Sequence, residues 1–137
     1  MPAKPYLLSF DHVGNPEIGY ITSTQLADNL PFSIKRVFWT QGTPTDVQRG
    51  YHANMATEEV LIALSGSIKV LTDTGHEVQE FELSNPQQGL YVPAMCWIEL
   101  TFSEGATALC LTSTDFSEKD YIRDYGYFKK LATHQAL

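Results

Sequence analysis

Residues 49–59, with the sequence RGYHANMATEE, decide the fold of this chain. Alternate residues of a β-strand point to the same face, so His52 and Asn54 are expected side by side while Ala53 faces away. Glu59 then opens an apolar run, and Gly66 follows at the next turn. This alternation predicts polar side chains gathered on one face of a strand.

The rest of the chain repeats one pattern, in which short alternating strands are separated by turn residues. A hairpin is expected at Gly66, between strands at 60–64 and 68–71. Glu118 to Leu131 carries an apolar stripe at helical spacing. These patterns predict an all-β jelly-roll barrel with a short C-terminal helix. The other strands are expected at 35–41, 78–83, 90–93, 97–102 and 106–111.

Length and charge restrict the class of protein. At 137 residues the chain is expected to be a single domain spanning residues 1–137. Sixteen acidic residues against nine basic ones argue against nucleic-acid binding, which requires a basic face. Cys96 and Cys110 are too few for a disulfide scaffold, and no apolar run is long enough to cross a membrane. Without a signal peptide, a cytoplasmic location is expected.

The stretch at 49–66 resembles the first motif of metal-binding cupins, in which two histidines stand one residue apart and a carboxylate follows. Here Asn54 occupies the place of the second histidine. A catalytic metal needs about three protein ligands, whereas His52 and Glu59 supply two. Ile98 stands where the second cupin motif would need a further histidine. We therefore expect neither a metal nor another cofactor.

Several segments, in order, resemble the sugar-nucleotide 3,4-ketoisomerase family (FdtA/QdtA, or WxcM-like cupins). The resemblance implies a metal-free cupin and a homodimer that exchanges N-terminal strands from residues 1–30. It also implies a nucleotide-linked substrate, a dTDP-linked 4-keto-6-deoxyhexose, whose carbonyl moves from C4 to C3 during synthesis of cell-surface polysaccharide such as O-antigen. The segments are PFSIKRV at 31–37, RGYHA at 49–53, SGS at 65–67, GLYVP at 89–93, Trp97 with Glu99, and DYIRDY at 120–125.

The chain departs from this family at positions that carry chemistry. The family has His-Ala-His-Lys where this chain has His-Ala-Asn-Met at 52–55. It has a tyrosine in an aromatic pair where this chain has Phe38-Trp39, and Trp-His-Glu where this chain has Trp-Ile-Glu at 97–99. A lysine, a phenol and imidazoles are therefore missing from the expected site.

A 4-keto to 3-keto shift requires a base for the C3 proton and a positive group for the enediolate oxygen. His52 is the remaining motif histidine and has a suitable ordinary pKa, so we assign it as the base. The alternative interpretation is that His52 is a structural residue of the barrel that only forms hydrogen bonds. Arg49 is expected to bind the enediolate or a phosphate. The alternative interpretation is that Arg49 forms an ion pair with an acidic residue at the surface.

Seven further residues are expected to bind the substrate. Asn54 suits a sugar hydroxyl but cannot transfer a proton at neutral pH, so His52 acts alone or with Glu59 or Tyr51. A structural role for Glu59, as a hydrogen-bond acceptor, is favoured over a catalytic one. Glu99 would orient an imidazole or accept from the sugar. Trp39 and Trp97 would stack on a base or sugar unless they pack in the core, and Arg36, like Arg123, would bind pyrophosphate or lie in the dimer interface.

Three classes of function remain open from the sequence. The first is an isomerase of nucleotide-linked keto sugars that acts through His52 and Arg49. The second is a non-catalytic cupin that binds a nucleotide sugar or a partner enzyme. The third is a related epimerase that uses the same enediolate.

Overall fold

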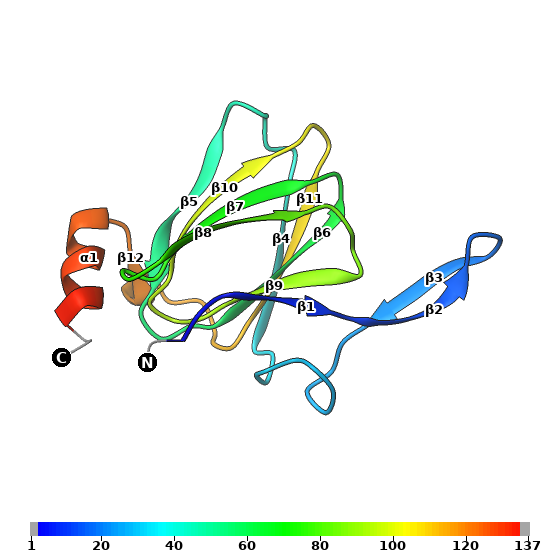
Figure 1. Cartoon of the computed structure of the whole chain (residues 1–137), viewed down its shortest axis with the longest axis horizontal. Coiled ribbons are helices and arrows are strands. Elements are labelled where there is room, and N and C mark those ends of the chain that lie inside the picture. Colours follow the sequence, from blue (N-terminus) through cyan, green and yellow to red (C-terminus); the bar gives the residue numbers. More distant parts are fainter. Residues whose placement is uncertain (1–2, 135–137) are drawn as a thin grey trace.

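Two five-stranded antiparallel sheets face each other in the computed structural model, which describes residues 3–134 (Figure 1). This arrangement confirms the predicted all-β jelly-roll with one short C-terminal helix. The elements are β1 (Tyr6–Ser9), β2 (Asp11–Asn15), β3 (Gly19–Ser23), β4 (Arg36–Gln41), β5 (Gln48–Asn54), β6 (Glu59–Ser65), β7 (Ile68–Asp73), β8 (Val78–Leu83), β9 (Gln88–Val92), β10 (Trp97–Phe102), β11 (Thr107–Thr112), a 3₁₀ turn (Glu118–Asp120), β12 (Tyr121–Ile122) and α1 (Tyr125–His134).

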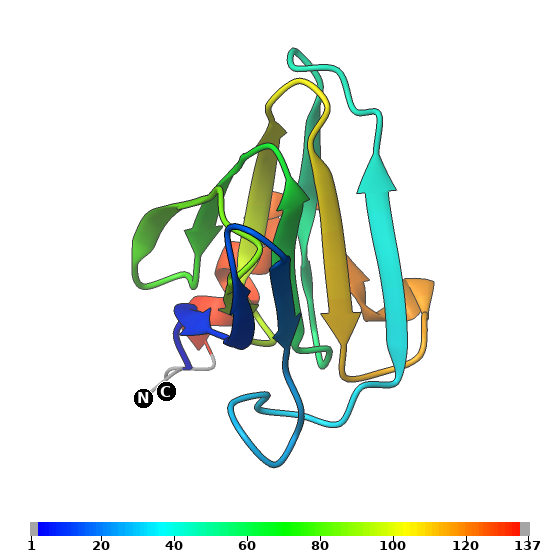
Figure 2. The ribbon, with the colours of Figure 1, turned by 90° about the vertical axis from the view of Figure 1, so that its right-hand side faces the viewer.

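The first sheet has the strand order β1-β9-β6-β11-β4, and the second has the order β12-β5-β10-β7-β8 (Figure 2). Strands β2 and β3 pair only with each other and project from the barrel, at the end opposite α1 (Figure 1). No helix within residues 3–134 is long and apolar enough to cross a membrane.

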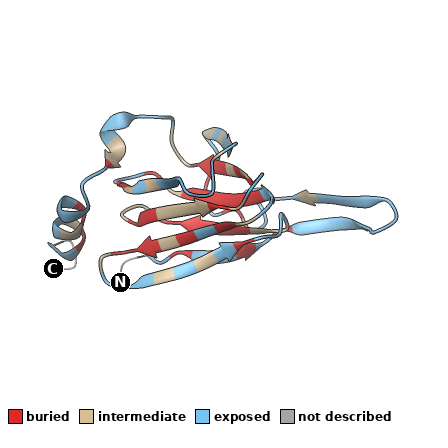
Figure 3. Ribbon diagram, turned by 90° about the horizontal axis from the view of Figure 1, so that it is seen from above, coloured by how far each residue is buried: buried red, intermediate tan, exposed pale blue. Residues whose placement is uncertain are grey.

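Alternation along the strands builds the core between the sheets (Figure 3). On β10, Ile98 and Phe102 point inward and are buried, whereas Glu99 and Thr101 are partly exposed on the other face. The main cluster also takes residues from the facing sheet. Its buried members are Leu61, Ala63, Ile68, Val70, Leu83, Leu90, Val92, Cys96, Ile98, Phe102, Ala106, Ala108 and Cys110.

The expected hairpin at Gly66 is wrong, because β6 and β7 lie in different sheets. Gly66 has a φ of +66°, and a Cβ there would lie 2.9 Å from the Cα of Ala106. The backbone N–H of Ser67 donates to Oγ of Ser103 at 2.8 Å. The glycine therefore marks a tight crossing from one sheet to the other. Local sequence predicts the turn but not the sheet to which each strand belongs.

The helix expected from Glu118 to Leu131 is also wrong over its first part. Residues 118–120 form a 3₁₀ turn, Tyr121 and Ile122 form β12, and α1 begins only at Tyr125. Strand β12 pairs with the end of β5, with Tyr121 opposite Asn54. Pairing with β5 thus overrides the helical periodicity and brings Tyr121 to the barrel mouth.

Helix α1 packs on the outer face of the second sheet through Phe128, which is completely buried. Its ring centroid lies 5.9 Å from that of Trp97, and Ala53 and Ile122 complete the same cluster. The helix therefore closes the outside of the sheet that carries β5.

We predict that Phe128→Ala lowers the free energy of unfolding by about 3–5 kcal/mol, the usual cost of truncating a buried phenylalanine. Tyr127→Ala, on the same helix but with a side chain that is 54% exposed, should change it by less than about 0.5 kcal/mol. Equilibrium unfolding in urea measures both values. Equal effects of the two variants would contradict the described docking of α1.

Candidate active site

A cavity of about 360 Å³ opens between the two sheets. Strands β4, β6 and β11 form one wall, β5 and β10 form the other, and the segment after β11 adds Tyr121 and Arg123. The lining side chains able to carry a charge are Arg36, Arg49, His52, Glu59, Cys110, Tyr121 and Arg123. Three of these seven are arginines, in a chain whose formal net charge is -7.

A β-bulge in β5 determines how this site is built. The register pairs Ile98 with His52 but Glu99 with Gly50, so Tyr51 is the extra residue. Gly50 and Tyr51 have φ angles of 85° and 55°. Only glycine fits at position 50, since a Cβ there would lie 2.8 Å from the carbonyl oxygen of Ile98.

The bulge brings Arg49 and His52 to the same face. In a regular strand, residues three apart point to opposite sides. Here Arg49 pairs with Leu100 and His52 pairs with Ile98, and all four residues line the cavity. The sequence placed Arg49 at the barrel rim, and the structure shows it exposed there.

The imidazole of His52 is half-buried and held in one tautomer. Its Nδ1 lies 3.1 Å from the carbonyl oxygen of Gly50, which can only accept, so Nδ1 carries the proton. The lone pair of Nε2 is then available as a base. Burial lowers the pKa of His52 from its ordinary value of 6.5, and the positive charge of Arg123 adds to this shift. The neutral, basic form is therefore favoured.

Tyr121 holds the imidazole from one side. The two rings are stacked with centroids 4.8 Å apart and planes inclined by 11°. The guanidinium of Arg123 lies 4.8 Å from the Tyr121 ring centre, and its Nε and Nη2 donate to the Glu118 carboxylate at 2.8 and 3.1 Å. The residues after β11 thus form one wall of the site.

Asp120 anchors this wall to the barrel. Its carboxylate accepts from the side chains of Asn54 at 3.0 Å and Thr57 at 2.5 Å, and from the backbone N–H of Ala56 at 2.7 Å. Burial by itself would raise the pKa of Asp120, but these donors outweigh it and lower the pKa. Asp120 is therefore held as a carboxylate directly before Tyr121.

Arg36 supplies a second guanidinium in the cavity. Its Cζ lies 4.5 Å from the ring centre of Phe38 and 5.0 Å from that of Phe116. The two aromatic faces hold the cation while leaving its N–H groups for an anion. With Arg49 and Arg123, the cavity presents three guanidinium groups.

Glu59 begins β6 and is 4% exposed. Burial raises the pKa of its carboxyl to about 7, against the thiol of Cys110 and the charge of Arg36, which both lower it. The Cys110 thiol donates to Oε2 of Glu59 at 3.5 Å. The sequence named Glu59 but gave no sign that Cys110, on β11, would contact it.

Neither Asn54 nor Tyr51 lines the cavity. Asn54 is beside His52 on β5, but it is 6% exposed and its amide donates to Asp120. Tyr51 is the bulge residue, faces away from the cavity, and its hydroxyl donates to Gln48. We therefore do not retain these two as substrate-binding residues.

Trp97 and Glu99 are likewise outside the cavity. Both lie on the outer face of β10, and Nε1 of Trp97 donates to Oε2 of Glu99 at 3.0 Å. Trp97 is buried under α1, so core packing is its role. Trp39 differs, because it lines the cavity on edge strand β4 while 63% of its surface is exposed.

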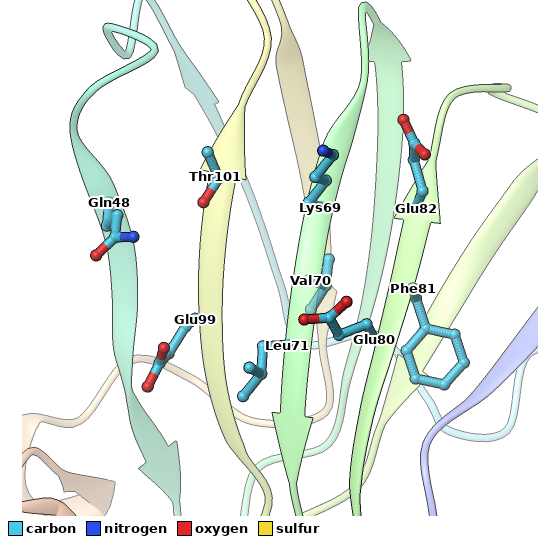
Figure 4. Close-up of a pocket in the computed structure, with 9 residues that line it drawn as sticks. All are labelled: Gln48, Lys69, Val70, Leu71, Glu80, Phe81, Glu82, Glu99 and Thr101. Carbon is cyan, nitrogen blue, oxygen red and sulfur yellow. The ribbon is translucent and has the colours of Figure 1, made fainter.

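A larger groove, of about 530 Å³, lies on the outer face of the second sheet (Figure 4). It contains the carboxylates of Glu80, Glu82 and Glu99 with the single cation Lys69. This charge repels phosphate, so an anionic ligand favours the cavity between the sheets. Within residues 3–134, no cluster of three or more His, Cys, Asp or Glu side chains has an arrangement suited to a metal ion.

Comparison with known proteins gives consistent matches over nearly the whole chain. The family model described as WxcM-like, C-terminal (FdtA) matches residues 4–133. A TDP-4-oxo-6-deoxy-α-D-glucose-3,4-oxoisomerase from Aneurinibacillus thermoaerophilus is 41% identical over 113 residues, covering 82% of this chain and 81% of that protein.

Solved structures match equally well. The 3,4-ketoisomerase QdtA from Thermoanaerobacterium thermosaccharolyticum, in complex with TDP, superposes with a TM-score of 0.92 at 33% identity, covering 100% of both chains. WlaRA, a TDP-fucose-3,4-ketoisomerase from Campylobacter jejuni, superposes with a TM-score of 0.90 at 35% identity, covering 98% of this chain and 100% of that chain.

We predict that Gly50→Ala destabilises the protein more than Gly42→Ala. Both glycines have positive φ, of +85° and +74°, but a Cβ at Gly42 would meet nothing within 4 Å. The added clash with Ile98 should cost Gly50→Ala about 1–3 kcal/mol beyond the loss in Gly42→Ala. Thermal and urea unfolding give the difference. Equal losses would argue against the bulge described for β5.

Proposed function

Since the chain belongs to the WxcM-like, C-terminal family, we propose that its reaction takes place in the cavity between the two sheets. The protein is an isomerase of nucleotide-linked 4-keto-6-deoxy sugars. The assignment of individual residues rests on the geometry of the cavity. The observation that carries it is the single tautomer of His52, whose Nε2 is left as a base among three arginines.

We assign His52 as the base that moves a proton between the two sugar carbons. The shift removes the proton from C3, forms an enediol or enediolate, and delivers a proton to C4. One imidazole on one face of the sugar serves both steps, since it becomes protonated in the first and is restored in the second. The stack on Tyr121 would fix the ring for both transfers.

Arg49 and Arg36 supply the positive charge. Arg49 shares the face of β5 with His52, so it suits the oxygen on which charge develops. Arg36, at the start of β4 between two aromatic rings, suits the diphosphate, as does Arg123. A planar guanidinium binds such oxygens with two hydrogen bonds at once.

We further propose that the nucleotide is thymidine diphosphate. QdtA was crystallised with TDP, and the similar proteins described above are named for TDP-linked sugars. The exposed ring of Trp39 at the cavity is the candidate surface for stacking of the base. The free, buried thiols of Cys96 and Cys110 suit a reducing compartment, so we place the protein in the cytoplasm.

A homodimer is proposed from hairpin β2–β3. An isolated two-stranded ribbon is marginally stable in water, and this one pairs with no other strand within residues 3–134. It also exposes Val13, Ile18, Tyr20 and Ile21, with exposed fractions between 52% and 80%. Such a surface is typical of a segment that packs against a second copy.

His52→Asn should reduce turnover of TDP-4-keto-6-deoxyglucose by roughly 10²–10⁴-fold, the usual cost of losing a positioned base. Binding of TDP, measured by calorimetry, should change little because other residues hold the nucleotide. His76→Asn, in an exposed turn, is the matched control. An unchanged rate in His52→Asn would remove the proposed base.

Exchange of the sugar ring protons with solvent distinguishes an isomerase from an epimerase and from a protein that only binds the sugar. In deuterated buffer, NMR of the wild-type reaction should show the 3-keto product, with deuterium at C4 to the extent that the protonated imidazole exchanges with solvent before it delivers its proton. Exchange without a new keto position would favour epimerisation. Neither exchange nor product would favour a nucleotide-sugar-binding protein.

The acid side of the pH profile should reflect His52. Its pKa lies below the ordinary 6.5, and the neutral ring is the active form. The decline of kcat/KM on the acid side should therefore begin only below pH 6.5. A decline centred above pH 6.5 would contradict the effect of burial on this ring.

Light scattering should give wild-type protein a mass twice the 15.3 kDa of one chain. The double variant Ile18→Asp, Ile21→Asp should be monomeric, because two carboxylates cannot be buried in an apolar interface. Val78→Asp, at an apolar side chain 59% exposed on β8, is the control and should stay dimeric. A monomeric wild type would rule out the proposed dimer.

A further inference from the structure

Glu59 faces His52 across the cavity but belongs to the other sheet. His52 lies on β5 and Glu59 on β6, and both line the cavity. The only side-chain hydrogen bond of Glu59 within residues 3–134 comes from Cys110 to Oε2. Within residues 3–134, every side-chain oxygen that is fully shielded from solvent has a hydrogen-bond partner. Oε1 of Glu59 has no partner in that part of the chain, so it must be accessible, and the space that it reaches is the cavity.

A carboxyl in this setting has two distinct oxygens. One is held by the weak donor Cys110, while the other is available to a bound molecule. Neither of the ion pairs within residues 3–134 includes Glu59, so no cation fixes it as a permanent carboxylate. In its neutral form it offers one O–H donor and one acceptor within a single planar group.

Most other charged or apolar lining groups do not match this capacity. The arginines stay protonated, and burial raises the pKa of the Cys110 thiol well above its ordinary value. Phe38 and Ile98 carry no exchangeable side-chain proton, and Tyr121 presents its ring face to the imidazole. His52 is committed to the carbon-bound proton, so the oxygen-bound proton needs a second carrier.

We propose that Glu59 relays the proton between the two oxygens of the sugar while His52 relays the proton between the two carbons. This role rests on the proposed function of the cavity. As His52 takes the C3 proton, Glu59 gives its proton to O4, and the enediol forms. Glu59 then takes the proton from O3, His52 returns its proton to C4, and the C3 carbonyl forms. Both side chains end in their starting states, and the protons balance.

The relay gives the carboxyl a role that a purely structural acceptor would not have. A structural carboxylate would work in its ionised form, whereas the relay begins with the neutral form. At neutral pH a substantial fraction of Glu59 is neutral, since burial raises its pKa to about 7. Within the relay, Cys110 holds Oε2 in place and leaves Oε1 to face the substrate.

The decisive variant is Glu59→Gln, which keeps the size and the acceptor for Cys110 but cannot transfer a proton. Turnover of TDP-4-keto-6-deoxyglucose should fall at least about 100-fold. TDP binding by calorimetry should stay within threefold of wild type. Glu58→Gln is the matched control, because Glu58 accepts from Tyr91 and does not line the cavity.

The pH profile separates a relay from a structural role. In wild type, kcat/KM should fall as pH rises through about 7, because Glu59 loses the proton that it must donate. Glu59→Gln should lose this alkaline decline from its residual rate. Glu59→Asp, which keeps a titratable carboxyl on a shorter side chain, should retain a decline and recover part of the rate.

A readout without substrate checks the neutral carboxyl itself. Because the folded-state pKa is raised from 4.5 to about 7, unfolding of wild type should become easier as pH rises across that interval. Glu59→Gln should lack this dependence. A stability profile identical in both proteins would overturn the neutral carboxyl on which the relay depends.

Each kinetic outcome has a separate meaning. Wild type that fails to convert the 4-keto substrate would refute the proposed function and this role with it. Active wild type, together with Glu59→Gln within threefold of its rate and with the same alkaline decline, would overturn the relay alone. The His52 base would remain in that case.

Discussion

The bulge at Gly50 and Tyr51 is the constraint on which the active cavity depends. It inserts one residue opposite Ile98 and Glu99, and thereby turns Arg49 and His52 to the same side of β5. It also places the Gly50 carbonyl against Nδ1 of His52, which leaves Nε2 free. One local departure from strand geometry therefore fixes the direction and the tautomer of the base and places Arg49 on the same face.

The segment after β11 completes the site by long-range contacts. Asp120 binds Asn54, Ala56 and Thr57, and so places Tyr121 against the imidazole. Apolar residues at Phe38 and Ile98 reduce the number of polar groups inside the barrel. A drier wall raises the cost of a buried carboxylate, which is consistent with the raised pKa of Glu59.

Much of the fold was predictable because its signals are local. Alternation along β10 and β11, the glycine-centred turns and the absence of helical periodicity before the tail specify a jelly roll. The placement of His52 on the inner face and of Arg49 at the rim also follows from residues close in sequence. The sequence did not place Trp97 and Glu99 in the same way. They were chosen because they match a family motif, and the motif does not say which face of β10 enters the barrel.

The sequence by itself determined an all-β barrel, its main turns and the residue types available to the site, since alternation and turn chemistry act between near neighbours. Only the tertiary structure decided that β6 and β7 join different sheets, that Tyr121 belongs to a strand, and that Asn54 is engaged by Asp120. It also showed that Glu59 contacts Cys110 and that both residues line the same cavity as His52. Asn54 and Asp120 lie 66 residues apart along the chain, and Glu59 and Cys110 lie 51 apart, so these contacts depend on how whole sheets pack rather than on any local pattern.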